Sequence, residues 1–146
     1  MEGNILLLSI RPEYAKRIID GSKTVELRRV RTRLQSGDLV LVYVSSPEKA
    51  LVGEFKVERV IDKKLPKELN NLWNQVKDEA GIGRTDFNSY YQGASVGVAI
   101  FFKHIEIFSQ KLELERLRKQ LPNLRPPQSY RYMTIDELEA VKSLLA

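Results

Sequence analysis

The chain has 146 residues, enough for one compact domain, and a formal net charge of +5 at neutral pH. The absence of cysteine excludes disulfides, iron–sulfur clusters and cysteine-zinc sites, and a single histidine argues against a histidine-rich metal site. No segment approaches the roughly 20 apolar residues of a membrane span, and the N-terminus lacks the basic start of a secretory signal. We therefore expect a cytoplasmic protein with no membrane partner and no cofactor.

The positive charge is concentrated in one short segment. Between Arg11 and Arg33 the sequence has eight basic residues against three acidic ones, a surplus that equals the whole net charge. A concentrated field attracts phosphates and other anions more effectively than the same charge spread over a surface. The composition therefore favours an anionic partner.

The first predicted elements are a strand, a helix and a second strand. The apolar run 5–10 predicts a buried strand, and Pro12 then opens a helix that ends at Gly21, a residue suited to a left-handed stop. From residue 24 the pattern alternates with period two. This places Thr24, Glu26 and Arg28 on one face of the strand and apolar residues on the other.

Two further strands follow a turn at residues 36–38. The run 39–44 is almost entirely apolar and β-branched, which predicts a strand buried on both faces. Residues 50–61 alternate again, with Gly53 at a bulge or at a close approach of two backbones. Long strands with bulges are typical of a small barrel.

The rest of the chain predicts several helices and one or two more strands. Helices are expected at 66–80, 85–91 and 112–121, and strands at 96–102 and 105–108. A proline-containing connection over 122–132 leads to a last helix, which starts at the capping box of Thr134 and Glu137 and runs to residue 145. We expect a single domain spanning residues 1–146, with a core over 5–108 and a C-terminal helical extension over 109–146.

The most specific motif follows the first helix. Gly21, Lys23, Glu26 and Arg28 match every fixed position of Gly-x-Lys-x-x-Glu-x-Arg, at a turn from a helix into a strand. With the Gly-Asp pair at 37–38 before an apolar strand, this arrangement resembles the ASCH family of the PUA-like superfamily. The clear resemblance covers roughly residues 5–61.

The resemblance implies a fold and a general function. The implied fold is α+β, a small PUA-like β-barrel of five to six mostly antiparallel strands with flanking helices and a C-terminal helix. The motif would line a cleft on the barrel wall. The family is thought to bind RNA or to act in nucleic-acid metabolism, so the implied partner is RNA, another nucleic acid or a nucleotide ligand.

The resemblance leaves open whether the protein is an enzyme. One branch of small bacterial members hydrolyses the acetyl group of N4-acetylcytidine, with the motif lysine as base and a threonine three residues later as nucleophile. Lys23 matches that lysine, but Glu26 stands where the threonine would be, which argues against this chemistry. Thr24 is a candidate for the nucleophilic hydroxyl in place of the missing threonine. Two other functions remain as alternatives, a ribonuclease of the same fold and an adaptor that binds an acidic protein.

The candidate site residues follow from these patterns. If the protein is an enzyme, the catalytic candidates are Lys23 and Glu26. As a carboxylate acceptor, Glu26 suits the exocyclic amine of cytosine, adenine or guanine, although Glu26 and Arg28 could also form a purely structural salt bridge. The candidates for nucleic-acid or ligand binding are Arg11, Lys23, Glu26, Arg28, Arg29, Arg31, Arg33, Tyr43, Ser45 and Ser46.

The arginines after the motif alternate with other residues. In an extended chain Arg29, Arg31 and Arg33 would lie along one edge, roughly 6 to 7 Å apart, similar to successive phosphates on an extended strand. The same pattern also suits a solvated edge strand that is protected by charge. Both interpretations remain open from the sequence.

Overall fold

The computed structural model describes residues 3–126 and 129–145 and shows eight strands and five helices there. None of these helices is both long and apolar enough to span a bilayer. The elements in chain order are β1 Ile5–Ile10, α1 Pro12–Ile19, β2 Val25–Arg28, β3 Leu39–Val44, β4 Ala50–Lys56, β5 Arg59–Lys64, α2 Leu69–Val76, α3 Arg84–Tyr91, β6 Val96–Phe101, β7 Glu106–Glu113, α4 Leu114–Gln120, β8 Tyr130–Tyr132 and α5 Ile135–Ser143.

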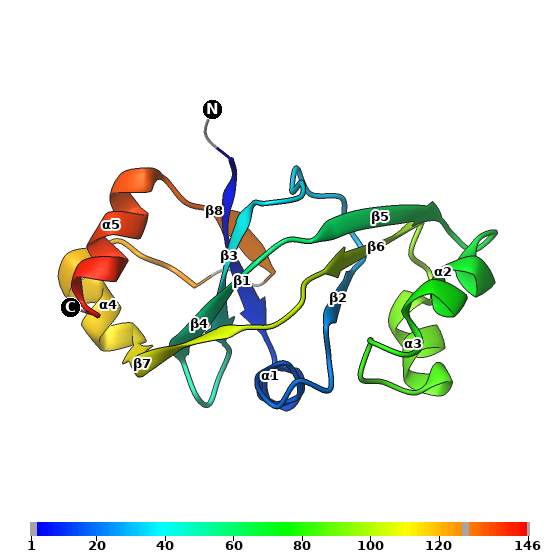
Figure 1. Cartoon of the computed structure of the whole chain (residues 1–146), viewed down its shortest axis with the longest axis horizontal. Coiled ribbons are helices and arrows are strands. Elements are labelled where there is room, and N and C mark those ends of the chain that lie inside the picture. Colours follow the sequence, from blue (N-terminus) through cyan, green and yellow to red (C-terminus); the bar gives the residue numbers. More distant parts are fainter. Residues whose placement is uncertain (1–2, 127–128, 146) are drawn as a thin grey trace.

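The strands form two sheets, and two long chain segments, residues 50–64 and 96–113, pass from one sheet into the other. One sheet has the order β7-β4-β3-β1-β8 and the other the order β2-β6-β5. Because β4 leads directly into β5 and β6 into β7, the antiparallel pairs β4–β7 and β5–β6 form one bent ribbon running through both sheets (Figure 1). Strands β1 and β3 are parallel and are joined by a connection that contains α1 and β2. The α+β class predicted from the sequence is confirmed.

Three apolar clusters hold this arrangement together. The main one gathers alternate residues of β1, β3, β4 and β6, such as Leu8, Val42 and Ile100, between the two sheets. A second cluster packs α2 and α3 against the outer face of the three-stranded sheet, and a third packs α4 and α5 against the five-stranded sheet. The two helix pairs consequently lie at opposite ends of the molecule (Figure 1).

Several local predictions are confirmed. Strands 5–10 and 39–44 have the expected bounds, and α1 begins at Pro12 and is followed by Gly21 with a φ of +86°. A Cβ on Gly53 would lie 2.6 Å from the carbonyl oxygen of Glu106, so the close approach of two backbones requires glycine there. The capping box at Thr134 is present.

Other local predictions differ from the structure where long-range pairing decides. The strand predicted over 50–61 is divided into β4 and β5 at the bend of the ribbon. The helix predicted from residue 112 begins only at Leu114, because Leu112 belongs to β7 and pairs with Leu51 of β4. The connection predicted over 122–132 contains β8, which pairs antiparallel with β1. The C-terminal segment therefore supplies a strand to the main sheet as well as helices.

Candidate functional site

The motif is placed by β2, an edge strand of the three-stranded sheet in the described part of the chain. Glu26 pairs with Ile100 and Arg28 with Val98, two residues of the main core. Since side chains alternate along a strand, Glu26 and Arg28 face the space between the sheets, while Val25 and Leu27 pack against α2 and α3. The alternation predicted from the sequence is confirmed for residues 25–28, whereas Thr24 precedes the strand.

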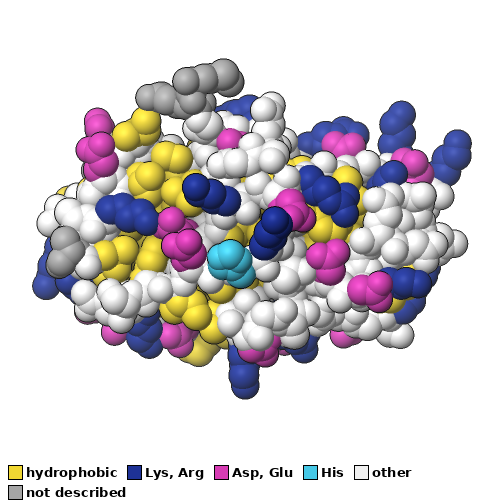
Figure 2. Space-filling model, in the orientation of Figure 1, with side chains coloured by type: hydrophobic (Ala, Val, Ile, Leu, Met, Phe, Trp, Pro, Cys, Tyr) yellow, Lys and Arg dark blue, Asp and Glu magenta, His cyan; other side chains and the backbone are white. Residues whose placement is uncertain are grey.

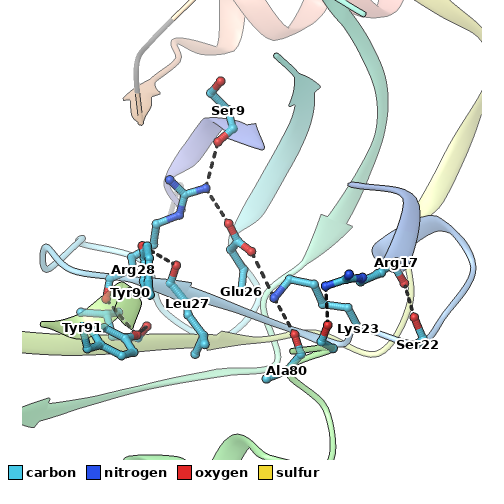
Figure 3. A network of polar contacts seen from close by, with 12 residues as sticks. Ser9, Arg17, Ser22, Lys23, Glu26, Leu27, Arg28, Ala80, Tyr90 and Tyr91 are labelled. Atoms are coloured by element: carbon cyan, nitrogen blue, oxygen red, sulfur yellow. Dashed lines mark hydrogen bonds and ion pairs between the residues drawn. The ribbon is translucent and has the colours of Figure 1, made fainter. Parts of the chain in front are cut away.

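A continuous chain of polar contacts runs through the motif (Figure 3). Arg28 Nη2 donates to the Ser9 carbonyl at 2.9 Å and lies 2.5 Å from Glu26 Oε2. The other carboxylate oxygen of Glu26 lies 3.5 Å from Lys23 Nζ, which donates to the Ala80 carbonyl at 2.9 Å. These contacts join the end of β1, the strand β2 and the loop between α2 and α3.

The charged groups of this chain are largely withdrawn from water. The side chains of Lys23, Glu26 and Arg28 are 3%, 8% and 12% exposed. Burial disfavours the charged ammonium and lowers the pKa of Lys23, an effect that Glu26 opposes and that Arg28 and Arg17 reinforce. Lys23 is therefore a better proton donor near neutrality than an exposed lysine.

A pocket of about 190 Å³ opens over these groups. Tyr14 from α1 and Tyr90 from α3 add aromatic rings to its wall, and Lys23 Nζ lies 5.7 Å from the centre of the Tyr14 ring. The lining residues are Ser9, Ile10, Arg11, Tyr14, Lys23, Glu26, Leu27, Arg28, Ile82 and Tyr90. We call this pocket the cleft.

Two tyrosines of α3 fix the backbone of β2. The Tyr90 hydroxyl donates to the Leu27 carbonyl at 3.0 Å, and the Tyr91 hydroxyl lies 3.2 Å from the Arg28 carbonyl. Burial raises the pKa of both hydroxyls, so both remain neutral donors at physiological pH. Helix α3 thereby positions the motif strand and one wall of the cleft together.

The loop between α2 and α3 lies against the base of the cleft. Arg17 Nη1 donates to the Gly81 carbonyl at 2.7 Å. Gly81 has a φ of +67°, and a Cβ there would lie 3.0 Å from Lys23 Cβ. The hydroxyl of Thr24, the substitute nucleophile considered from the sequence, donates instead to Glu79 in this loop at 3.0 Å.

The structure brings some predicted site residues together and separates others. Arg11, Lys23, Glu26 and Arg28 line the cleft. Tyr43 is 3% exposed and belongs to the apolar cluster beneath α4 and α5, so the structure places it in the core and outside the lining of the cleft. Ser45 and Ser46 follow the end of β3 and also lie outside this lining.

The arginines after the motif lie outside the cleft as well. Arg29, Arg31 and Arg33 are exposed and belong to an irregular segment rather than to a strand. The extended chain that both interpretations of the sequence assumed is therefore not present there. Arg31 pairs with Asp62 at 3.3 Å. Both side chains are at least half exposed, so this pair adds little stability.

Sequence reasoning missed part of the cleft wall. Tyr14 and Ile82 were not singled out, and Tyr90 was not placed in the site. The i, i+4 spacing puts Tyr14 on the same face of α1 as Ile18, which could have indicated that its ring turns inward. The contribution of Ile82 depends on how the loop between α2 and α3 packs, and no local pattern signals it.

Within residues 3–126 and 129–145, no group of three or more histidine, aspartate or glutamate side chains is arranged to hold a metal ion. The charged and aromatic groups that line the cleft are one carboxylate, one lysine, two arginines and two phenols. This set can bind a polar ring and an anion together, and it can exchange protons between Lys23 and Glu26.

The comparisons with known proteins concern the family and the fold. The family model of the ASCH domain matches residues 8–122. The chain belongs to the ASCH family. The resemblance read from the motif is thereby confirmed, and with it the PUA-like fold class.

Among the relatives, an ASCH domain-containing ribonuclease from Zymomonas mobilis is 26% identical over 138 residues, 94% of this chain and 90% of the relative. The crystal structure of ASCH from Zymomonas mobilis matches with a TM-score of 0.87 at 25% identity, covering 97% of this chain and 96% of that one. Human THYN1, solved with 5-methylcytosine-containing DNA, has a TM-score of 0.61 at 15% identity over 97% of this chain and 96% of its own. This last likeness concerns the fold alone.

Proposed function

We propose that this protein binds single-stranded RNA and holds one nucleotide of it in the cleft. The observation that carries the proposal is the buried carboxylate of Glu26, fixed by Arg28 at 2.5 Å and Lys23 at 3.5 Å at the base of a pocket with two tyrosines in its wall. An ionised carboxylate has about four acceptor sites, of which these two contacts use two. The remaining sites accept hydrogen bonds from a base.

The ligand chemistry follows from the groups in the cleft. Glu26 accepts from an exocyclic amine, which cytosine, adenine and guanine have and uracil lacks. Tyr14 and Tyr90 offer ring surface for a base, as is typical of proteins that recognise unpaired nucleotides. Arg11 lines the same pocket, is exposed, and supplies positive charge for the phosphate.

One relative supports a nucleic-acid ligand. The Zymomonas mobilis protein that matches nearly the whole chain is named a ribonuclease. Because this likeness covers almost the full length of both chains, it also favours a second candidate function for this protein, the cleavage of RNA.

The cleft offers a metal-independent route for that cleavage. The 2′-oxygen of the ribose forms a bond to the adjacent phosphorus, and the bond from phosphorus to the 5′-oxygen of the next nucleotide breaks. Glu26 accepts the proton of the 2′-hydroxyl, and Lys23 donates a proton to the departing 5′-oxygen. Arg11 stabilises the charge on the phosphate oxygens. The products are a 2′,3′-cyclic phosphate and a 5′-hydroxyl.

The contact between Lys23 and Glu26 resets the site after each turnover. At 3.5 Å the protonated carboxyl can return its proton to the neutral amine, and burial has already lowered the pKa of Lys23 toward the range in which such transfers are efficient. Hydrolysis of N4-acetylcytidine is less well supported, because Glu26 replaces the nucleophilic threonine and is bound by two cations.

The binding proposal is tested with fluorescein-labelled single-stranded RNA and DNA of the same sequence, at two salt concentrations. Glu26→Gln should reduce the preference for cytosine-containing over uracil-only RNA. Glu48→Gln, a matched change in an exposed pair with Lys111, should not. If none of these oligomers binds to the wild type, the proposal is wrong.

Cleavage is followed by mass spectrometry in the same samples. Wild type should yield 2′,3′-cyclic phosphate from RNA and no product from DNA, and Lys23→Met should abolish the product while Lys111→Met does not. Binding without any product would leave the protein a binding module. Release of acetate from an oligomer that contains N4-acetylcytidine would instead support the amidohydrolase alternative.

A further inference from the structure

The chain that leaves the cleft after Arg28 lies beside β8. At the cleft, Arg28 Nη1 donates to Ser129 Oγ at 3.2 Å. Farther along, the Tyr130 hydroxyl donates to the Arg31 carbonyl at 3.3 Å, and the Arg33 amide donates to the Tyr132 hydroxyl at 2.7 Å. Residues 28–33 and 129–132 thus form one continuous surface that starts at the cleft.

Three arginine side chains project from this surface, and we call them the arginine strip: Arg29, Arg31 and Arg33. Arg29 donates to a carbonyl oxygen, that of Gln92, at 3.4 Å. Neither Arg29 nor Arg33 has a carboxylate within salt-bridge distance among the described residues. The strip therefore keeps most of its positive charge uncompensated.

The contacts that attach β8 do not occupy these guanidinium groups. The two hydrogen bonds with the tyrosine hydroxyls of β8 use the carbonyl of Arg31 and the amide of Arg33, so they leave the side-chain donors of both arginines free. The Arg33 guanidinium lies 4.0 Å above the Tyr132 ring, which holds it by a cation–π interaction without neutralising it. A guanidinium held over a ring in this way can still contact a phosphate.

The charge pattern around the single histidine is different. Figure 2 shows the face that carries the single histidine, where Lys and Arg side chains are interspersed with Asp and Glu. A hollow with lining from β4 and the start of β7 contains Lys56, Lys103, Glu54 and Glu58 together. That face offers a basic side chain an acidic neighbour, whereas the arginine strip mostly does not.

We propose that the arginine strip carries the sugar-phosphate backbone of the RNA away from the cleft. The inference rests on the proposed function, and it defines the substrate class as single-stranded oligonucleotides rather than free nucleotides. The backbone positions of residues two apart lie at most about 7 Å from each other in any conformation, so neighbouring arginines of the strip are close enough to reach successive phosphates of an extended single strand. Three arginines therefore match about three phosphates beyond the nucleotide in the cleft.

The test measures affinity against RNA length. Fluorescein-labelled oligocytidylates of one, two, four, six and eight nucleotides are titrated into wild type, Arg29→Gln/Arg33→Gln and the control Lys56→Gln/Lys103→Gln, at about 50 and about 200 mM salt. The control removes the same amount of positive charge from the hollow near β4 and β7. Comparison with the control therefore separates the effect of the strip from general electrostatic attraction between protein and RNA. Thermal melting of each variant, and the charge-preserving Arg29→Lys/Arg33→Lys, separate lost contacts from lost folding.

Affinity of the wild type should rise up to about four nucleotides and then level off. Each phosphate contact on a single strand contributes about 0.7 to the slope of log affinity against log salt, so the loss of two contacts lowers that slope by about 1.4. Between the two salt concentrations the wild type should lose about sevenfold more affinity for the octamer than Arg29→Gln/Arg33→Gln. The lysine variant should keep most of the wild-type slope.

Two outcomes would overturn the inference while leaving the proposed function intact. One is an affinity of the wild type for cytidine monophosphate that equals its affinity for the octamer. The other is a salt dependence of Arg29→Gln/Arg33→Gln that equals the salt dependence of the control Lys56→Gln/Lys103→Gln. Failure of every oligocytidylate to bind the wild type would contradict both the inference and the proposed function.

Discussion

Residues 23–33 contain two adjacent groups of charged side chains that differ in burial and in charge compensation. Lys23, Glu26 and Arg28 are at most 12% exposed and compensate one another. The arginine strip begins at the next residue, is exposed, and pairs with one carboxylate, Asp62, in the described residues. Because the first group is buried, removing one of its charges should strongly destabilise the fold, and its contribution to stability should depend on pH. Because the second group is exposed, its interactions should be screened by salt and should contribute little to the free energy of unfolding.

The largest expected effect comes from removing the buried carboxylate. Glu26→Ala leaves two buried cations without a counter-charge, which should lower the free energy of unfolding by about 3 to 5 kcal/mol. Asp62→Ala, which removes the exposed partner of Arg31, should cost less than about 1 kcal/mol. Chemical denaturation at neutral pH measures both. Equal losses in the two variants would contradict the contrast between the two groups.

A second test distorts the loop that holds Lys23. Gly81 and Gly93 both have a positive φ, but only at Gly81 would a Cβ meet Lys23, at 3.0 Å. Gly93→Ala should cost about 1 to 2 kcal/mol for the backbone alone, and Gly81→Ala about 1 to 3 kcal/mol more. RNA binding should weaken only in Gly81→Ala. Identical stability and binding in the two variants would show that the loop does not position the lysine.

The pH dependence of stability tests the burial of Lys23. Because its pKa is lower in the folded protein than the ordinary 10.5, the unfolded chain binds more protons between the two values. The free energy of unfolding of the wild type should therefore rise relative to Lys23→Met as pH increases toward 10.5. Denaturation between pH 7 and pH 10 measures this difference. A difference that falls with pH would mean that Glu26 outweighs burial.

The smallest expected effect on stability belongs to the arginine strip. Arg29→Gln should change the free energy of unfolding by no more than about 0.5 kcal/mol, and Arg33→Gln by about 0.5 to 1 kcal/mol through the lost contact with Tyr132. Thermal or chemical denaturation would detect a larger loss. A cost above about 2 kcal/mol would identify the strip as a structural element that attaches β8.

Local patterns predicted the motif strand well. The alternation over residues 24–28 placed Glu26 and Arg28 on one face, and the structure turns that face toward the space between the sheets. Proline and glycine marked both ends of α1, because their backbone preferences act within a single turn. These features depend on neighbours in sequence, so the sequence alone predicts them.

Features that depend on distant partners were not predictable in this way. Strand β8 has three residues, too few for a pattern, and exists because β1 offers it an unpaired edge. The apolar character of residues 39–44 favours a core position for Tyr43, but the cluster that receives its side chain forms only when α4 and α5 pack on the five-stranded sheet. The wall residues Tyr90 and Ile82 reach the cleft only through the packing of α3 and its preceding loop.

The contact between Arg28 and Ser129 spans 101 positions of the sequence and has a consequence for the order of events during synthesis. Strands β1 and β2 leave the ribosome early, whereas β8 emerges among the last described segments of the chain. Until β8 docks on β1, Arg28 lacks its serine partner, and the tyrosines that order residues 31–33 are absent. The contacts of Arg28 with Ser129, and those of residues 31–33 with β8, can therefore form only after the C-terminal part of the fold has been synthesised.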